Sequence, residues 1–525
     1  MNSHERRIVE FLSTRRAYPH PAGRIARRET HVSHVFLAGD FAYKLKKPVR
    51  FPFLDASTLV RRKRFCQLEL ALNRRLAPAI YLSTVPVTEE AGTLKLGGRG
   101  RAVEWLVRMR RLPEARMLDR LVASGSVRRK EATEIAERLI SFFRKAARSR
   151  RIDFYGRPAQ VAALLLGNLQ ECLRFIGAVL TEPDRQRIEA AYRQWLALHE
   201  PLLARRLREG RIIDGHGDLR CENICLTKPV SIFDCVEFQP AFRCGDVAND
   251  FSFLVMDLEF RGREDLAAIL ARCYRRLVRD PTFDAVLPVY QCHRTLVRGK
   301  VRGFAWLQHP RSRSGQQVRA LARRHFRLAG RYVRQFAPPR LVVIGGAIGT
   351  GKSTLAGSLA KAMGLVWLRT DQIRRQEFAH LRGRGQGFEQ GLYAPRVSEL
   401  VYQRLISQAE ALVREGRSVV CDGTFSRASG RRALRAIARR HGASFHYVEC
   451  VTLRGVALQR AARRAAAGGD WSEARPEHYG PLKAGYEPVR GWSAREWTRL
   501  STAGSPTATH QHALAALRRA WRIPS

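Results

Sequence analysis

A glycine-rich run that ends in a lysine and two hydroxyl residues is the clearest chemical motif in the sequence. Residues 345–354 read Gly-Gly-Ala-Ile-Gly-Thr-Gly-Lys-Ser-Thr. Glycines let backbone N–H groups curl around a phosphate, the lysine reaches the β- and γ-phosphate oxygens, and the next hydroxyl binds Mg²⁺. The motif therefore predicts a nucleotide site, in which Ser353 is also a metal ligand and the binding residues are Gly346, Gly349, Gly351, Lys352, Ser353 and Thr354.

A second group of residues suited to phosphate transfer lies more than a hundred residues earlier, at His216-Gly-Asp-Leu-Arg-Cys-Glu-Asn223. Phosphoryl transfer needs a carboxylate that orients or deprotonates the attacking hydroxyl, ligands for Mg²⁺, and a cation on the phosphates. Asp218 and Asn223 have the spacing of the base and the metal-binding Asn in a kinase catalytic loop. Asp234 follows the strand-like run 231–233. We predict Asp218 as the base, with Asn223 and Asp234 as Mg²⁺ ligands.

The phosphate cation that acts with Asp218, Asn223 and Asp234 is predicted to be Lys44. Ala42 and Lys44 share one face of a predicted strand, so a small residue can lie against adenine while the ammonium reaches phosphate. Glu69, on the next predicted helix, is placed to pair with the lysine. Ordinary surface charge is the alternative for both residues, and Lys46 and Lys47 compete for the same role.

Two domains are expected to position these residues. A chain of 525 residues is too long for one core, and a proline pair precedes the glycine-rich motif. We therefore predict domains at 1–336 and 340–525. In the first domain the patterns predict strands at 35–37 and 41–45 around a turn, a helix at 58–76, mostly helical sequence at 131–208, and strand pieces at 212–213, 224–226 and 231–233.

The second domain shows strands that alternate with helices. This pattern is typical of an α/β fold with a parallel, doubly wound sheet, which binds nucleotide in the crevice at its switch point. The predicted strands are 341–344, 365–368, 418–421 and 445–451.

The first domain resembles the aminoglycoside phosphotransferase and choline kinase branch of the protein-kinase-like fold. The resemblance rests on His216–Asn223, on the run Ile232–Phe238, and on the acidic positions Asp246 and Asp250. It implies a two-lobed α+β domain that is an ATP-dependent small-molecule kinase. Two features depart from the pattern: Arg220 stands where His is commoner, and no Gly-x-Gly-x-x-Gly loop precedes the predicted lysine.

The second domain resembles small P-loop kinases of the AAA type, such as gluconate kinase, polynucleotide kinase and the zeta toxins. That resemblance implies that Asp371 contacts the acceptor hydroxyl and that Asp422, after the next strand, holds Mg²⁺. It also implies that Arg460 and Arg464, with Arg463, belong to a lid over the transferring phosphate; solvated surface is the alternative for each arginine. The whole chain resembles a bacterial fusion family of an aminoglycoside phosphotransferase with a P-loop ATP-binding domain.

These features predict a bifunctional kinase that uses ATP and Mg²⁺ and transfers phosphate to hydroxyl groups of small molecules. One alternative is a regulatory protein whose first domain binds nucleotide without transferring phosphate and gates the P-loop domain. Another is that the P-loop domain is a nucleic-acid end kinase. The sequence identifies neither acceptor, and it leaves the oligomeric state open.

Composition bears on partners and location. The formal net charge is +47, but a codon bias toward arginine would produce it, so a nucleic-acid partner is left open and not favoured. No apolar run is long enough to cross a bilayer and the N-terminus lacks a signal peptide, so we expect a cytoplasmic protein without a membrane partner. Ten scattered cysteines favour reduced, buried thiols over disulfides. A zinc cluster of Cys221, Cys225, Cys235 and Cys244 is disfavoured because paired Cys-x-x-Cys knuckles are absent.

Two nucleotides are expected to bind per chain, because each domain has its own phosphate cation and metal ligands. Lys352→Ala removes the cation of one site, so calorimetry with a non-hydrolysable ATP analogue should give two equivalents for the wild type and one for the variant. A wild-type value of one that falls to zero in Lys352→Ala would mean that the first site is vestigial.

Overall fold

The computed structural model describes residues 3–51, 54–381, 391–467 and 476–524. The chain forms two compact units, one of Met1–Val161 with Arg206–Thr295 and the other of Ala162–Arg205 with Leu296–Ser525. The predicted boundary between residues 336 and 340 falls inside the second unit. The reason is packing, since Leu198 shares a hydrophobic core with Val342 and Ile344 of the strand before the glycine-rich loop.

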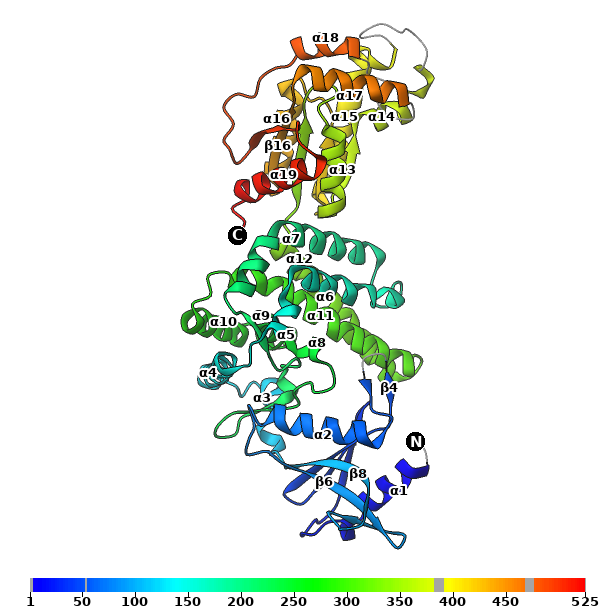
Figure 1. The fold of residues 1–525 in the computed structure, drawn as a ribbon, viewed down its shortest axis with the longest axis vertical. Coiled ribbons are helices and arrows are strands. Elements are labelled where there is room, and N and C mark those ends of the chain that lie inside the picture. Colours follow the sequence, from blue (N-terminus) through cyan, green and yellow to red (C-terminus); the bar gives the residue numbers. More distant parts are fainter. Residues whose placement is uncertain (1–2, 52–53, 382–390, 468–475, 525) are drawn as a thin grey trace. The chain divides into compact units, whose positions relative to one another are not determined.

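An antiparallel sheet of six strands, in the order β1-β2-β3-β8-β6-β7, begins the first unit (Figure 1). The predicted hairpin is present, because β2 and β3 pair with Val35 opposite Lys44. Two long strands, β6 and β8, were not predicted, since charged and polar residues interrupt their alternation. The strands are β1 (Ala26–Glu29), β2 (Ser33–Ala38), β3 (Phe41–Lys46), β6 (Tyr81–Glu90), β7 (Thr93–Leu96) and β8 (Arg101–Arg110).

Helices cover both faces of this sheet. Helix α1 (Ser3–Leu12) packs on one face through Ile8 and Leu12, in a core with Phe36 and Leu45. Helix α2 (Leu59–Asn73) packs on the other face through Cys66, and Figure 1 shows it running across the sheet. The predicted helix therefore exists but ends before residue 76. A separate short pair, β4 (Arg50–Phe51) with β5 (Leu54–Asp55), precedes it.

The remainder of the first unit is mainly helical and carries two short antiparallel pairs, β9 with β12 and β10 with β11. Helix α9 is the centre of this part, since nearly all of its residues are buried. The elements are α3 (Leu118–Ala123), α4 (Arg129–Lys145), α5 (Arg150–Asp153), β9 (Ile212–Asp214), β10 (Ile224–Cys225), β11 (Ser231–Ile232), α8 (Pro240–Arg243), β12 (Cys244–Asp246), α9 (Val247–Phe260), α10 (Glu264–Val278) and the start of α11 (Phe283–Gln308).

The second unit contains a parallel sheet of five strands in the order β14-β15-β13-β16-β17. The predicted doubly wound arrangement is found, because alternate residues of β13 enter different cores. Leu341 and Val343 face α15 and α16, whereas Val342 and Ile344 face α13 and α19. The strands are β13 (Arg340–Gly345), β14 (Val366–Arg369), β15 (Val419–Asp422), β16 (Ser444–Val451) and β17 (Trp497–Ser501). The edge strand β17 was missed because its half-exposed, mixed sequence lacks the apolar run of the other four.

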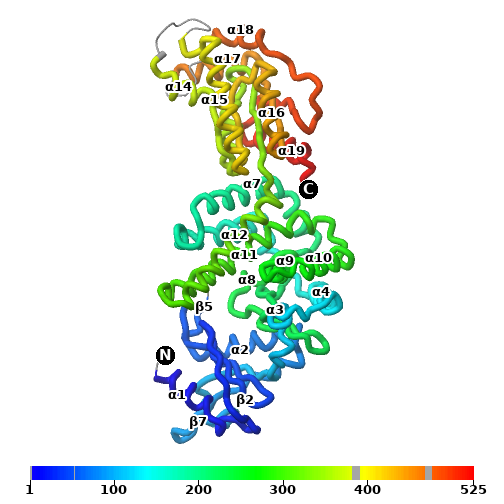
Figure 2. The backbone as a smooth tube through the Cα atoms, turned by 180° about the vertical axis from the view of Figure 1, so that it is seen from behind, coloured from blue at the N-terminus to red at the C-terminus, as the bar shows by residue number. Residues whose placement is uncertain are grey.

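The helices of this sheet are α13 (Lys352–Met363), α14 (Thr370–Glu377), α15 (Pro395–Arg414), α16 (Ala428–Arg440), α17 (Arg454–Ala467), α18 (Tyr479–Ala484) and α19 (Pro506–Ala520). Most of α6 (Pro158–Gln170), most of α7 (Glu182–Arg208), the end of α11 and α12 (Arg313–Phe336) complete the second unit. Figure 2 labels α7, α11 and α12. None of the helices in the described residues combines the length and apolar character that a bilayer span requires.

A proline inside α7 explains one contact between this helix and α19. Pro201 has no N–H, so the carbonyl of Ala197 lacks its usual partner in the helix. Arg518 of α19 donates to that oxygen at 2.8 Å and to the oxygen of Leu198 at 3.0 Å. The backbone defect in α7 is thus satisfied by a side chain from the P-loop fold.

Arg206 should be essential for the stability of the first unit. It is buried and pairs with two buried carboxylates, Asp246 at 2.6 Å and Asp280 at 2.8 Å. Arg206→Met removes the cation that both carboxylates contact, so the free energy of unfolding in urea should fall by about 3–5 kcal/mol. The exposed Arg208 on the same helix is the control, and Arg208→Ala should change it by less than about 0.5 kcal/mol. A loss below about 1 kcal/mol in Arg206→Met would contradict the assignment.

Candidate active sites

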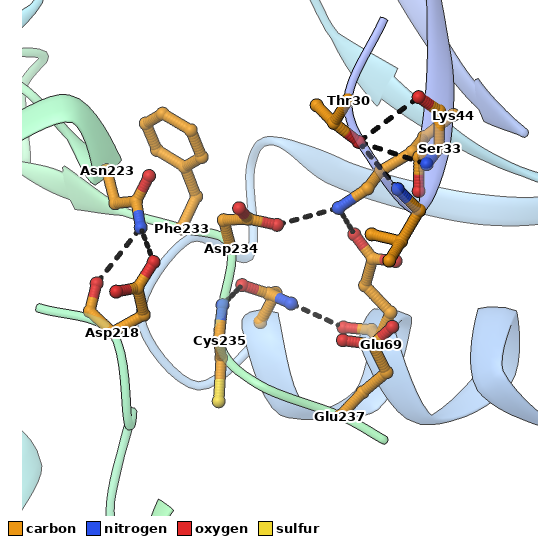
Figure 3. A network of polar contacts seen from close by, with 12 residues as sticks. Thr30, Ser33, Lys44, Glu69, Asp218, Asn223, Phe233, Asp234, Cys235 and Glu237 are labelled. Carbon is orange, nitrogen blue, oxygen red and sulfur yellow. Dashed lines mark hydrogen bonds and ion pairs between the residues drawn. The ribbon is translucent and has the colours of Figure 1, made fainter. Parts of the chain in front are cut away.

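Two lysines of β3 converge on one buried carboxylate in the first unit. Figure 3 shows the contact of one of them, Lys44, with this carboxylate, Glu69. Side chains two residues apart on a strand point to the same face, which brings Lys44 and Lys46 toward α2. Lys44 Nζ lies 2.7 Å from Glu69 Oε1 and Lys46 Nζ lies 2.5 Å from Glu69 Oε2. Lys44 and Glu69, which the sequence pairs, are therefore in contact. Lys47 instead binds Glu29 at 2.5 Å.

Asp234 joins the same network. Lys44 Nζ lies 2.6 Å from Asp234 Oδ1, and Lys46 also binds Glu237. The backbone of Asp234 has a φ of +63°, a conformation that costs a non-glycine residue energy and that is found most often at functional sites. Its N–H donates to the hydroxyl of Tyr81 at 3.2 Å. The strained backbone is thus held in place, and its carboxylate faces Lys44.

Burial and charge act in opposite directions on these groups. Burial alone would raise the pKa of Asp234, but Lys44 lowers it to about 2. Burial alone would lower the pKa of Lys44, but Asp234 and Glu69 raise it well above its ordinary value. Glu237 differs, since burial keeps its pKa raised in spite of Lys46. Lys44 and Asp234 therefore stay charged across the physiological pH range.

The predicted base, Asp218, is surrounded by hydrogen-bond donors. Asn223 Nδ2 donates to its Oδ2 at 3.0 Å and to its backbone oxygen at 2.9 Å. Arg220 donates to both carboxylate oxygens of Asp218, with Nε 2.8 Å from Oδ1 and Nη2 2.9 Å from Oδ2. Arg220 also binds Glu222. The residue that departs from the family pattern is thus the one that holds the predicted base.

Carboxylates of α9 fix the backbone of the predicted catalytic loop, residues 216–223. Asp250 accepts from the N–H groups of His216 at 2.7 Å and Gly217 at 2.8 Å, and Asp257 accepts from Cys221 at 3.0 Å. Gly217 has a φ of +85°, and a Cβ there would lie 2.8 Å from the oxygen of Phe242. Only glycine fits this turn.

The strand pair β10–β11 brings Asn223 and Asp234 to neighbouring segments. Ile224 pairs with Ile232, and the N–H of Phe233 donates to Asn223 O at 3.0 Å. An amide oxygen and a carboxylate are ligands that suit a Mg²⁺ ion whose other ligands are phosphates and water, so this donor set fits the predicted metal.

The cysteines include the four of the disfavoured zinc cluster. All ten are buried and free. In the described part of the chain, no group of three or more His, Cys, Asp or Glu side chains is arranged to hold a metal ion.

Glycines of the loop between β13 and α13 are required by close contacts or by backbone conformation. A Cβ on Gly346 would lie 2.3 Å from Cys450 O, and one on Gly349 would lie 2.1 Å from Ala457 O. Gly346, Gly349 and Gly351 all have positive φ, at +138°, +71° and +77°. The loop is therefore pressed against β16 and α17, and its left-handed turns need glycine.

Lys352 begins α13 and turns back over the loop, where its Nζ donates to Ala347 O at 2.8 Å. Burial lowers the pKa of Lys352, and Asp422 and Asp371 oppose that shift. Burial raises the pKa of Asp422, which Lys352 and a hydrogen bond with Ser353 counteract. Ser353 and Asp422 are thus adjacent oxygen donors of a kind that fits a Mg²⁺ ion. Thr354 is exposed in the first turn of α13.

Asp371 stands in the first turn of α14, directly after β14. Arg369, at the end of β14, lies 3.8 Å from Asp422. Arg374 is buried, binds Leu392 O and lies over the ring of Tyr393. The structure thus brings Asp371 into the electrostatic reach of Lys352 and Asp422, while Arg374 braces the segment after α14.

Arg460 and Arg464 lie one turn apart on α17. Arg460 Nη2 donates to Thr502 O at 3.0 Å, and its Nη1 lies 3.7 Å from where a Cβ of Gly351 would be. Arg464 contributes to the lowered pKa of Lys352. Both arginines are therefore near the loop, whereas Arg463 is exposed. Two glycines at 468–469, which follow α17 in the sequence, lie outside the described residues.

Some residues beside the second site escaped sequence reasoning. Tyr402 shares a hydrogen bond with Thr424 at 3.0 Å and accepts one from the N–H of Phe425, whose φ is +46°. Thr502 donates to Thr350 O at 2.7 Å. A positive φ at a buried aromatic residue has no sequence signature, and Thr502 follows the strand that was not predicted.

The glycine contacts give a direct test of the loop. Gly349→Ala places a methyl group against a backbone oxygen at a positive φ, so it should weaken binding of an ATP analogue at the second site at least about tenfold. Gly455→Ala is the control, because no atom lies within 4 Å of a Cβ there. Calorimetry compares the two variants. Equal affinities would contradict the packed loop.

Comparisons with known proteins agree with a P-loop domain in the second unit. Residues 341–489 match the family described as AAA domain. Among solved structures, a gluconokinase from Sinorhizobium meliloti 1021 is 19% identical over 34% of this chain and 93% of its own, with a TM-score of 0.28. A choline/ethanolamine kinase family protein from Mesorhizobium loti is 15% identical over 61% of this chain and 98% of its own, with a TM-score of 0.36. At such TM-scores neither alignment supports a conclusion about this chain.

Two mycobacterial proteins are similar over most of the chain. "Uncharacterized protein Rv2004c" of Mycobacterium tuberculosis (strain ATCC 25618 / H37Rv) and "Uncharacterized protein Mb2027c" of Mycobacterium bovis are each 35% identical over 422 residues. The alignments cover 80% of this chain and 81% of each relative. At that identity and coverage, the chain belongs to the same family as these two mycobacterial proteins.

Proposed function

We propose that the protein is a bifunctional ATP-dependent phosphotransferase with one active site in each unit. The observation that carries the proposal is that each unit has a lysine held among carboxylates. Lys44 contacts Glu69 and Asp234, and Lys352 lies in the field of Asp422 and Asp371. A phosphate chain needs such a cation, and the free protein needs carboxylates to compensate it.

In the first site, Asp218 is the group that takes the proton of an acceptor hydroxyl. Asn223 orients the carboxylate through its amide, so one Asp218 oxygen is fixed in direction. The bound Arg220 must give up part of its contact with Asp218 when acceptor enters, and its guanidinium then stands beside the transferring phosphate.

In the second site, Asp371 orients the acceptor and Lys352 neutralises the charge on the β- and γ-phosphates. Arg460 and Arg464, one turn apart, supply further positive charge from α17. Asn223 and Asp234 in the first site, and Ser353 and Asp422 in the second, would hold a Mg²⁺ ion, which would supply positive charge against the phosphates.

We infer a small-molecule hydroxyl compound as the acceptor of the first site, on the resemblance of its catalytic loop to small-molecule kinases. The regulatory hypothesis is a second candidate, and the bidentate Arg220–Asp218 pair favours it, because a base occupied in this way does not accept a proton. An experiment on full-length protein separates the two.

Site-specific variants of the full chain allow each activity to be measured alone. Lys352→Ala leaves only the first site, and Lys44→Met leaves only the second. With labelled ATP and a panel of polyols, amino sugars and 5′-hydroxyl oligonucleotides, Asp218→Asn in the Lys352→Ala background should lower transfer by about 10²–10⁴. Asp371→Asn should do the same in the Lys44→Met background. Each aspartate variant should retain its ATP equivalent, because a base acts on the acceptor.

The outcomes distinguish the candidates. If Lys352→Ala binds one ATP analogue but transfers no phosphate to any acceptor, the regulatory hypothesis replaces the proposal for the first unit. Transfer only to 5′-hydroxyl oligonucleotides by Lys44→Met would identify the second unit as an end kinase.

A further inference from the structure

The acidic residues of this chain are unevenly distributed. Between Asp284 and Asp371 lie 86 residues that include 16 Lys and Arg but no Asp or Glu. At the chain's average frequency, a stretch of this length would contain about eight acidic residues. A general bias toward arginine raises the number of cations, but it does not remove the anions. This segment therefore differs from the rest of the chain in a way that composition does not explain.

Helix α12 concentrates this charge on one face. It has seven arginines in 24 residues. Its apolar face is already buried, with Phe326 against Gly299 of α11 and Phe336 stacked on Tyr192 of α7. The opposite face is exposed, and at helical spacing it presents Arg313, Arg324, Arg327, Arg331 and Arg334. We call these five residues the arginine row.

The row has the dimensions of a phosphate backbone contact. At a rise of 1.5 Å per residue, Arg313 and Arg334 are separated by about 30 Å along the helix, and the last four arginines lie within about 15 Å. Guanidinium groups bind phosphate in a bidentate way. One negative charge occurs per about 1.7 Å of a DNA duplex, so several guanidinium groups can each meet a phosphate at once.

We propose that the arginine row of α12 is a binding surface for the phosphate backbone of a nucleic acid. Charge complementarity carries the choice of partner. A membrane-bound amphipathic helix needs an apolar face that enters the lipid, and the apolar face of α12 is buried in the second unit. The expected binding is independent of base sequence, because backbone contacts carry no sequence information. The proposal does not depend on phosphotransfer at either site.

The test compares two variants of the full chain with the same loss of charge. The first is Arg324→Gln/Arg327→Gln/Arg331→Gln/Arg334→Gln. The control is Arg414→Gln/Arg417→Gln/Arg432→Gln/Arg439→Gln, which removes four exposed arginines of α15, its following loop and α16. Binding to labelled 20-mers of duplex DNA, duplex RNA and single-stranded DNA is measured by fluorescence anisotropy from 50 to 300 mM salt.

The row variant should bind duplex DNA about 100-fold more weakly than wild type at 100 mM salt. Its salt slope, which is the change in the logarithm of the binding constant with the logarithm of salt concentration, should be smaller in magnitude by about 3 to 4. The control should stay within about threefold of wild type. Both should keep the wild-type thermal transition and ATP-analogue stoichiometry. If the fourfold row variant fails to fold, the double variant Arg327→Gln/Arg334→Gln should still reduce the salt slope, by about half as much as is expected for the fourfold variant. The DNA and RNA arms show which backbone is preferred.

Three results would overturn the proposal. Equal losses in the row variant and the control would mean diffuse attraction to net charge. A wild-type slope below about 2 would mean that no row of phosphates is contacted. Vesicles of anionic lipid are the third arm, because α11 exposes Val301, Phe304 and Leu307. Row-dependent binding to vesicles without row-dependent binding to nucleic acid would assign the surface to a membrane.

Discussion

The first unit depends on the need to keep an ammonium group charged where water is largely excluded. A buried charge costs several kcal/mol unless a partner compensates it. Glu69 meets this need for two lysines at once, since each of its oxygens takes one ammonium. Asp234 and Glu237 complete the pattern from the other side. Because β3, α2 and the segment after β11 all contribute, the pairing fixes the positions of three elements around one carboxylate.

The second unit also contains a partly buried lysine, and both backbone groups and side chains compensate its charge. Its loop runs so close to Cys450 O and Ala457 O that side chains at Gly346 and Gly349 are excluded, and glycines at these positions let a phosphate approach the backbone closely. Lys352 rests on Ala347 O, and Asp422 compensates its charge. The two units thus present a lysine with carboxylates through unrelated folds, one antiparallel and one parallel.

Arginine serves different purposes in different parts of the chain. Arg206 is buried between two carboxylates, Arg518 satisfies the carbonyl that Pro201 frees, and Arg220 grips Asp218. The acceptors of these arginines lie within the fold, and they are carboxylates for Arg206 and Arg220 and backbone carbonyls for Arg518. The arginine row of α12 lies in a segment without acidic residues, and its five residues are exposed. The net charge of +47 therefore includes both arginines that contact acceptors within the fold and the exposed arginines of α12.

The sequence by itself determined the features that local chemistry dictates: the glycine-rich loop between a strand and a helix, the hairpin around residues 38–40, four of the five parallel strands, and the pairing of Lys44 with Glu69. It missed β6, β8 and β17, because strands with mixed polarity are stabilised by neighbours that are distant in sequence. Only the tertiary structure decided that Lys46 shares Glu69, that Arg220 holds Asp218, and that α7 packs with the P-loop sheet. Those outcomes depend on which side chains meet across the fold, and spacing along the chain does not encode them.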